Sequence, residues 1–283
     1  MKILLTGRSG QVGSALERAL APLGNLTAVD RAGMDLLDAH AIRAKVKELK
    51  PAIIVNAAAY TAVDRAETER EAVFAVNAAA GILAEEARKI DALLIHFSTD
   101  YVFDGEKRTP YIESDAPAPL NVYGASKLVS ERLVAASGCR HFIFRASWVY
   151  GPASRNFLRA ILAAADSKPE LRVVDDQHGA PTSSAALAVA LAHILARPDL
   201  LQRPSGIYHL SAAGETTWYG FAKEILELKG PKARVTPISS AEYGAPARRP
   251  GNSMLDNTKA RNTFGFGLDH WRDVLAAVMR TMH

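Results

Sequence analysis

A glycine-rich turn near the start of the chain restricts its possible folds more than any other feature. Residues 2–6 (KILLT) form a strand-like apolar stretch, and residues 7–13 (GRSGQVG) carry glycine at every third position before a helical pattern that runs to Pro22. Glycines permit a sharp turn and a close approach of backbone to a pyrophosphate, whose charge the following helix N-terminus stabilises. In this strand–turn–helix order, Gly7, Gly10 and Gly13 predict a dinucleotide-binding turn.

Short apolar stretches and amphipathic stretches continue to alternate through the first half of the chain. The further strands that we expect are residues 26–29, 52–55, 92–97 and 142–146, and the helices include residues 38–49 and 69–90. Repeated strand–helix crossovers predict an α/β fold with a parallel sheet and helices on both faces. Ligands of such sheets bind beyond the carboxyl ends of the strands. The residues at or just after those ends are Gly10, Asp30, Ala59, Thr99 and Tyr123.

Asp30 ends the second expected strand, about 20 residues beyond the glycines, where an acidic group can hydrogen-bond an adenosine ribose. A helix or loop cap is an equal alternative for this carboxylate. Asp30 favours a free 2′-hydroxyl, whereas Arg8 and Arg31 are able to hold a 2′-phosphate. The sequence therefore leaves the choice between NADH and NADPH open.

Tyr123 and Lys127 stand four residues apart in a helical stretch, so their side chains share one helix face. An ammonium within about 4–6 Å lowers the pKa of a phenol by roughly 1–3 units. The pair is thus a candidate general acid/base. Such pairs are common on exposed helices, and it is the strand–helix series around this one that favours the functional interpretation.

Composition narrows the class of protein. A length of 283 residues with 48% hydrophobic residues suits one large α/β domain, or one with a smaller partner. The net charge of +4 is modest and unclustered, which suits an anionic small substrate and not nucleic acid. The single cysteine, Cys139, indicates a reducing compartment. With no secretory signal and an apolar run (residues 185–196) too short for a bilayer, we expect a soluble cytoplasmic protein without membrane partners.

Several segments together resemble the extended short-chain dehydrogenase/reductases and, more closely, the dTDP-4-dehydrorhamnose reductases among them. The segments that carry this resemblance are residues 7–13, 55–64, 98–103, 119–124, 147–150, 176–182 and 249–253. They cover nearly the whole chain in order, which makes the resemblance far more specific than the glycine turn alone. It implies a doubly wound parallel sheet of the Rossmann type with a smaller, discontinuous α/β substrate-binding lobe.

The domain organisation that we expect follows from where the strand–helix alternation loosens, after Gly151. Residues 1–149 would bind the dinucleotide, and residues 182–211, with a helix over 184–196 and a strand over 206–210, would return to that sheet. The rest of residues 150–283 would form the nucleotide-sugar lobe, with a helix over 156–165, a strand over 171–174 and a helix over 218–228. Thr217 is positioned to cap this last helix.

The resemblance implies an NAD(P)H-dependent oxidoreductase that reduces the C4 keto group of dTDP-4-dehydro-L-rhamnose. By that similarity Tyr123 donates the proton to the developing alkoxide, and Lys127 lowers the pKa of Tyr123 and holds the nicotinamide ribose. Thr99 hydrogen-bonds the reacting oxygen and tunes Tyr123. Donors placed where negative charge develops stabilise the transition state.

Two further groups of residues are candidates for binding. The resemblance together with the glycine turn implies cofactor contacts at Gly7, Gly10, Gln11, Val12, Gly13, Asp30, Asp35, Leu36, Ala59, Tyr60, Thr61, Phe97, Tyr123 and Lys127. The substrate candidates, from the resemblance or from side-chain chemistry, are Thr99, Asp100, Trp148, Gln177, Arg249 and Asn252.

Each of the last four substrate candidates has a structural alternative. Trp148 follows an expected strand and either enters the sugar pocket or packs in the core. The guanidinium of Arg249 suits a diphosphate, although Arg248 competes for that role and both are alternatively a solvated surface pair. Gln177 and Asn252 either read sugar or base edges or cap loops.

Some members of this reductase family are magnesium-linked dimers that use acidic residues near the C-terminus, but residues 274–283 contain none. We therefore predict no metal site, and a homodimer stays possible. Two alternative functions stay open: an extended-family epimerase or dehydratase that retains its cofactor, and a dinucleotide-binding regulatory subunit like that of methionine adenosyltransferase.

Overall fold

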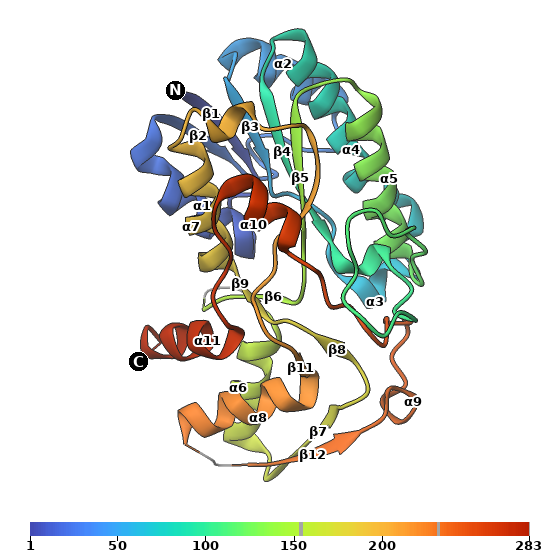
Figure 1. The fold of residues 1–283 in the computed structure, drawn as a ribbon. Coiled ribbons are helices and arrows are strands. Elements are labelled where there is room, and N and C mark those ends of the chain that lie inside the picture. The colour runs from blue at the N-terminus through green and yellow to red at the C-terminus, as the bar shows by residue number, and fades with distance from the viewer. Residues whose placement is uncertain (153–154, 231–232, 283) are drawn as a thin grey trace.

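The computed structural model describes residues 1–152, 155–230 and 233–282, so the last residue of the tail, His283, lies outside it. Within these ranges, six parallel strands form one sheet in the order β10-β5-β4-β3-β1-β2 (Figure 1). Their bounds are β1 (Lys2–Thr6), β2 (Asn25–Val29), β3 (Ile53–Asn56), β4 (Leu93–Thr99), β5 (His141–Ala146) and β10 (Gly206–His209). The predicted α/β fold class is confirmed.

Helices cover both faces of this sheet because successive strand residues point to opposite sides. Ile3 and Leu5 pack with the helices α1 (Gln11–Leu20) and α7 (Ser184–Leu195) on one face. Leu4, between them, packs on the other face, which is covered by α2 (Ala39–Leu49), α4 (Arg70–Lys89) and α5 (Val122–Ala136). Figure 1 shows these two layers on either side of the strands.

The glycine turn lies at the point where the strand order reverses, since β1 has β2 on one side and β3 on the other. Gly7 has φ +74°, and a Cβ there would come within 2.7 Å of the backbone of Ala58, just after β3. A Cβ at Gly13 would lie 1.9 Å from the carbonyl oxygen of Gly7. Only glycine fits these two positions, so the turn brings backbone from β1, β3 and α1 together at one crevice.

A second lobe lies below the sheet in Figure 1. It contains α6 (Phe157–Ser167), β7 (Glu170–Val174), α8 (Trp218–Lys229), β12 (Arg234–Ile238) and α11 (Trp271–Arg280). β7 pairs with β12 in parallel, and Phe221 and Trp271 are fully buried in the lobe's own core. The hydroxyl of Thr217 accepts a hydrogen bond from the backbone N–H of Gly220, which confirms the predicted cap of α8.

The remaining described elements are short. They are η1 (Ala21–Leu23), α3 (Val63–Ala66), η2 (Asp100–Val102), β6 (Val149–Tyr150), β8 (His178–Gly179), β9 (Thr182–Ser183), η3 (Leu200–Gln202), β11 (Thr216–Thr217), α9 (Ser240–Tyr243) and α10 (Thr258–Phe264). No helix in the described ranges is both long and apolar enough to span a bilayer. The expected strand over residues 92–97 extends two residues further, so Thr99 is the last residue of β4.

A buried ion pair links α5 to the sheet beneath it. Arg145 on β5 donates from Nε and Nη2 to the two carboxylate oxygens of Glu131 on α5, at 2.9 Å and 2.7 Å. Both side chains are 2% exposed. Ser98 also donates to Glu131 from the neighbouring strand. These contacts fix the position of α5 relative to β4 and β5. They thereby also fix Tyr123 and Lys127, which lie at the start of α5.

Candidate active site

In the part of the chain that the structure describes, two neighbouring cavities lie at the carboxyl ends of the sheet strands, and a third adjoins them in the second lobe. The glycine-turn cavity, of about 300 Å³, is lined by Gly7, Asp30 and Tyr60 among others. The Tyr123 cavity, of about 380 Å³, is lined by Thr99, Tyr123 and Lys127, and it shares Gly10, Ala57 and Ala59 with the first. The second-lobe cavity, of about 700 Å³, shares Tyr101 and Trp218 with the Tyr123 cavity.

The wall between the first two cavities is the N-terminus of α1. Gly10 is the N-cap residue and provides no side-chain cap, so the first-turn backbone N–H groups have no intrahelical or capping acceptor. Gln11 and Val12 line the Tyr123 cavity beside it. The side chain of Gln11 is engaged with the second lobe, because its oxygen accepts from Asn156 at 2.9 Å. The exposed peptide donors of this turn suit an anionic group such as a diphosphate.

Asp30 both lines the glycine-turn cavity and caps its own loop. Its Oδ1 accepts hydrogen bonds from the backbone N–H groups of Ala32 and Gly33, at 3.1 Å and 3.2 Å. Asp35 lines the same cavity, pairs with Arg31 at 3.1 Å and has its pKa lowered, first by the hydrogen bond from the backbone of Leu37.

The other cofactor candidates lie around these two cavities. Leu36 is a buried wall of the glycine-turn cavity, and Arg8 pairs with Glu17 at 3.0 Å. Tyr60 lines the glycine-turn cavity and Thr61 the Tyr123 cavity, while Ala59 lines both. The backbone of Tyr60 is held by Asn77, whose Oδ1 accepts from its N–H at 2.8 Å. Phe97 lines the Tyr123 cavity at the end of β4.

The start of α5 sets the position of Tyr123. The side chain of Asn121 accepts from the N–H of Gly124 at 2.8 Å, and Glu67 accepts from the N–H of Val122 at 2.9 Å. A Cβ at Gly124 would lie 2.1 Å from the carbonyl oxygen of Tyr101, so glycine allows α5 to approach the end of β4 closely. The first two turns of the helix therefore face the Tyr123 cavity.

The sequence-based prediction that Lys127 lowers the pKa of Tyr123 is wrong for this structure. Burial raises the pKa of Tyr123 to about 12, and the opposing hydrogen bond with Thr99 is the weaker effect. The ammonium of Lys127 is itself desolvated, which lowers its pKa to about 8, and it donates to the carbonyl oxygen of Phe97 at 2.7 Å. Tyr123 therefore keeps its phenolic proton across the neutral pH range.

Asp100 is a buried carboxyl beside this pair. It accepts a hydrogen bond from the hydroxyl of Thr99 at Oδ1 and from that of Ser147 at Oδ2, both at 3.0 Å. Burial raises its pKa to about 6, although the hydrogen bonds from Ser253, Thr99 and Ser147 oppose the rise. Near neutral pH the ionised carboxylate therefore directs the single hydroxyl proton of Thr99.

We expect activity to fall as the pH drops through about 6, because Asp100 then becomes protonated and no longer orients Thr99. Asp100→Asn should abolish this acidic limb of the kcat/KM profile. Ser147→Ala removes a donor that stabilises the ionised form, so it should move the limb upward by about 1 pH unit. A limb that stays at the same pH in both variants would show that another group titrates there.

Trp148 is held in a stacked pair that sequence reasoning did not foresee. Its ring lies on that of Trp218 with centroids 3.7 Å apart and an interplanar angle of 9°. A Cβ at Gly179 would come within 2.4 Å of the same ring, and Trp148 itself has φ +46°. Trp148 is therefore both packed and placed at the Tyr123 cavity, which both tryptophans line. The sequence carries only one indication that Trp218 is placed near the site, its position directly after Thr217, which caps α8.

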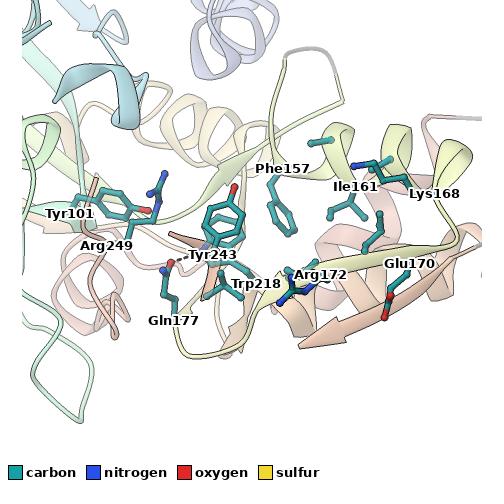
Figure 2. A pocket seen from close by; sticks show the side chains of 15 residues that line it. Tyr101, Phe157, Ile161, Lys168, Glu170, Arg172, Gln177, Trp218, Tyr243 and Arg249 are labelled. Carbon is teal, nitrogen blue, oxygen red and sulfur yellow. Dashed lines mark hydrogen bonds between the residues drawn. The ribbon is translucent and has the colours of Figure 1, made fainter. Parts of the chain in front are cut away.

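Of the two amide side chains that the sequence offered for substrate binding, Gln177 lines the second-lobe cavity and Asn252 does not. Figure 2 shows Gln177 beside Trp218. The indole N–H of Trp218 donates a hydrogen bond to the side-chain oxygen of Gln177 at 3.1 Å. The nitrogen of the same amide donates to Ser240 at 2.8 Å, so Gln177 braces the cavity wall. Asn252 lies outside the three cavities, since its amide bonds the backbone of Lys107 and Met254. For Asn252 the loop-capping alternative is the one observed.

The structure also separates Arg249 from its neighbour Arg248. Arg248 is exposed, whereas Arg249 is half-buried and lines the second-lobe cavity beside Tyr101 (Figure 2). The guanidinium of Arg249 donates to Asp64 at 2.9 Å and to the carbonyl oxygen of Ala247 at 3.0 Å. Arg249 is thus an oriented cation at the cavity. Among the described residues, no three His, Cys, Asp or Glu side chains group in a way that could hold a metal ion.

Comparisons with known proteins agree over the whole chain. The family model described as the RmlD substrate binding domain matches residues 1–283. A dTDP-4-dehydrorhamnose reductase of Burkholderia thailandensis is 43% identical over 296 residues, covering 100% of this chain and 99% of that protein. The crystal structure of a dTDP-4-dehydrorhamnose reductase from Clostridium acetobutylicum has a TM-score of 0.95 at 34% identity, covering 100% and 99% of the two chains. That of the Bacillus anthracis enzyme in complex with NADP has a TM-score of 0.94 at 34% identity, covering 99% of each.

Proposed function

The chain belongs to the family described as the RmlD substrate binding domain and is an NAD(P)H-dependent oxidoreductase, and we propose that it reduces the C4 keto group of dTDP-4-dehydro-L-rhamnose to give dTDP-L-rhamnose. The observation that carries the proposal is the meeting of Thr99, Tyr123 and Lys127 in one cavity beside the glycine turn. The names of relatives that match over the full chain support the sugar nucleotide.

The residues of the first two cavities fit a nicotinamide dinucleotide, which supplies the hydride when it is bound. The uncapped peptide N–H groups after Gly10 would hold its diphosphate, and Asp30 its adenosine ribose. Lys127 and Tyr123 would hold the nicotinamide ribose. Asp30 favours NADH, whereas Arg8 and Arg31 favour NADPH, so we propose that the enzyme accepts either cofactor. Parallel assays with the two cofactors would show which one it prefers.

In the proposed reaction, Tyr123 gives its phenolic proton to the oxygen on which negative charge develops. Its raised pKa keeps that proton in place until the oxygen becomes basic. Thr99 lies at the same cavity, and to donate to the same oxygen its hydroxyl would turn away from Asp100, to which it donates in this structure. General acid catalysis of this kind contributes about 10²- to 10⁴-fold to the rate.

The second-lobe cavity would take the nucleotide of the substrate. We propose that residues 150–181 and 212–283 form most of this substrate lobe and that residues 182–211 belong to the dinucleotide domain. Arg249 would bind a diphosphate oxygen pair, and the stacked pair of Trp148 and Trp218 would border the sugar. The ion pair of Arg249 with Asp64 keeps the guanidinium at the cavity when no anion is bound.

Arg249→Met is expected to raise the KM for the nucleotide sugar about 10- to 100-fold, because charge-assisted hydrogen bonds contribute roughly 1.5–3 kcal/mol each. The exposed neighbour supplies a matched control, since Arg248→Met removes the same charge one residue away. Initial-rate measurements on both variants check the assignment. Equal effects of the two substitutions would indicate only a general electrostatic attraction.

A coupled assay tests the function itself. dTDP-4-dehydro-6-deoxyglucose and the preceding epimerase generate the substrate, and the oxidation of NADPH and of NADH is followed in parallel. We expect oxidation that depends on both the sugar and this enzyme. Cofactor that survives gel filtration with no net oxidation during turnover would instead identify an epimerase or dehydratase. Cofactor binding without turnover of any nucleotide sugar would identify a regulatory binding module.

A further inference from the structure

We infer that His96 is a positioning residue for Lys127. Its neutral imidazole lies against the inner side of the ammonium group and offers it no acceptor, and so directs the N–H groups of Lys127 toward the Tyr123 cavity. His96 lies on β4 and is 1% exposed. Its Nε2 is 3.3 Å from Nζ of Lys127. The inference rests on the proposed function, which gives Lys127 its role.

The hydrogen bonds of Asn56 determine which ring nitrogen of His96 carries the proton. The backbone N–H of Ala58 donates to Oδ1 of Asn56 at 3.3 Å, and the hydroxyl of Thr6 donates to the same oxygen at 2.7 Å. A backbone N–H can only donate, so this oxygen is the acceptor and the amide nitrogen points the other way. That nitrogen lies 3.0 Å from Nδ1 of His96. Since an amide nitrogen donates, Nδ1 is the unprotonated ring nitrogen.

A neutral ring must then carry its proton on Nε2, and Ser130 accepts it. Oγ of Ser130 lies 3.0 Å from Nε2. The hydroxyl donates its own proton to the carbonyl oxygen of Lys127 at 2.7 Å, which leaves its lone pairs for the ring N–H. Both ring nitrogens are therefore satisfied in the neutral form. Burial holds the pKa of His96 well below its usual value, and the charges of Lys127 and His141 act in the same direction.

This tautomer prevents Nε2 of His96 from accepting a hydrogen bond from the ammonium group of Lys127. Because Nε2 bears hydrogen, the acceptor left to the ammonium among the described residues is the carbonyl oxygen of Phe97, at 2.7 Å. One of three N–H groups is thereby used, and the others remain for groups that enter the cavity lined by Lys127. The nearby charged residue on the same helix, Glu131, is paired with Arg145; burial lowers the pKa of Lys127, and the charge of Glu131 offsets only part of that lowering.

The test replaces the imidazole by an acceptor of similar reach. In His96→Gln the side-chain amide extends to the position of Nε2, where its oxygen is able to accept from Lys127 and turn the ammonium inward. The Kd of NADPH, measured by fluorescence without sugar, should then rise about tenfold, because a hydrogen bond to a charged group is lost. Loss of the ammonium proton of Lys127, whose pKa burial lowers to about 8, should give the kcat/KM profile an alkaline limb, and this limb should move to higher pH in His96→Gln, since a carbonyl acceptor favours the charged form of Lys127.

His209→Gln is the matched control. His209 is equally buried, on β10, and its ring bonds Arg145 and the backbone of Tyr111. This substitution should lower the thermal midpoint as much as His96→Gln but leave the Kd and the alkaline limb unchanged. Equal changes in both variants, or wild-type behaviour of His96→Gln, would overturn the inference.

Two further measurements separate the possible failures. Lys127→Met tests the proposed function: if it binds NADPH like the wild type, the role assigned to Lys127 is wrong. If it binds more weakly while His96→Gln does not, only the inference about His96 fails. Nitrogen-15 spectra of the wild-type histidines need no variant to fold. We expect a neutral ring protonated on Nε2 for His96 between pH 6 and 9, and a proton on Nδ1 or a titrating ring would contradict the inference.

Discussion

Tyr123→Phe is expected to lower kcat about 10³-fold, because it removes the one proton that the proposed reaction takes from the protein. The aromatic ring itself stays, and so does its edge-to-face packing against Tyr101, whose ring centroid lies 6.1 Å away. The cavity should therefore keep its shape. The KM for the sugar should change little, and the Kd of the reduced cofactor should rise only modestly, because the contact of the Tyr123 hydroxyl with the nicotinamide ribose is lost while that of Lys127 remains. Steady-state kinetics with separate kcat and KM values check this expectation.

A second tyrosine serves as the control for the loss of a hydroxyl group. Tyr111 lies outside the three cavities, stacks on Phe103 and donates to Asp104 at 2.6 Å. Tyr111→Phe should cost some stability and leave kcat near the wild-type value. If Tyr123→Phe keeps kcat within about threefold of the wild type, Tyr123 is not the acid, since a general acid contributes at least 10²-fold.

Glu131→Ala is expected to destabilise the folded state by about 3–5 kcal/mol, because it leaves the guanidinium of Arg145 buried without a counter-charge. Both carboxylate oxygens of Glu131 are engaged, by Arg145 and by Ser98. The loss should appear as a lower midpoint of urea unfolding. The variant should also bind cofactor less tightly, because α5 carries Tyr123 and Lys127 as well as Glu131.

An exposed ion pair provides the comparison. Glu85 pairs with Arg43 at 3.5 Å, and its side chain is 56% exposed. Glu85→Ala should change the free energy of unfolding by less than about 1 kcal/mol, as surface pairs do. Similar losses in Glu131→Ala and Glu85→Ala would mean that burial of the Arg145 pair does not stabilise the fold.

The features that the sequence predicted well depend on neighbouring residues. The alternation of apolar and helical stretches predicted the parallel sheet, because burial imposes a period of two on strands and 3.6 on helices. The cap of α8 was readable for the same reason: Thr217 accepts from the N–H group of Gly220. The end of β4 was placed too early, since Ser98 and Thr99 are polar but lie in a strand whose pairing with β5 continues to Ala146.

The features that the sequence did not predict join residues far apart in the chain. The sequence named Arg249 with Arg248 as a competitor, but the ion pair of Arg249 with Asp64 is a contact that a linear pattern cannot show. The stack of Trp148 on Trp218 and the contact of His96 with Lys127 arise in the same way. Periodicity placed Lys127 on the face of Tyr123 but gave no information on burial. Burial is the dominant cause of both pKa values, which is why the predicted direction for Tyr123 was wrong.

Transfer of deuterium tests the central claim most directly. The enzyme is given dTDP-4-dehydro-L-rhamnose and a reduced cofactor labelled with deuterium at the transferable position, and the product is analysed by mass spectrometry and NMR. We expect dTDP-L-rhamnose with one deuterium, at C4, for each cofactor oxidised. A product without deuterium, or with deuterium at another carbon, would contradict reduction of the C4 keto group at the Tyr123 cavity.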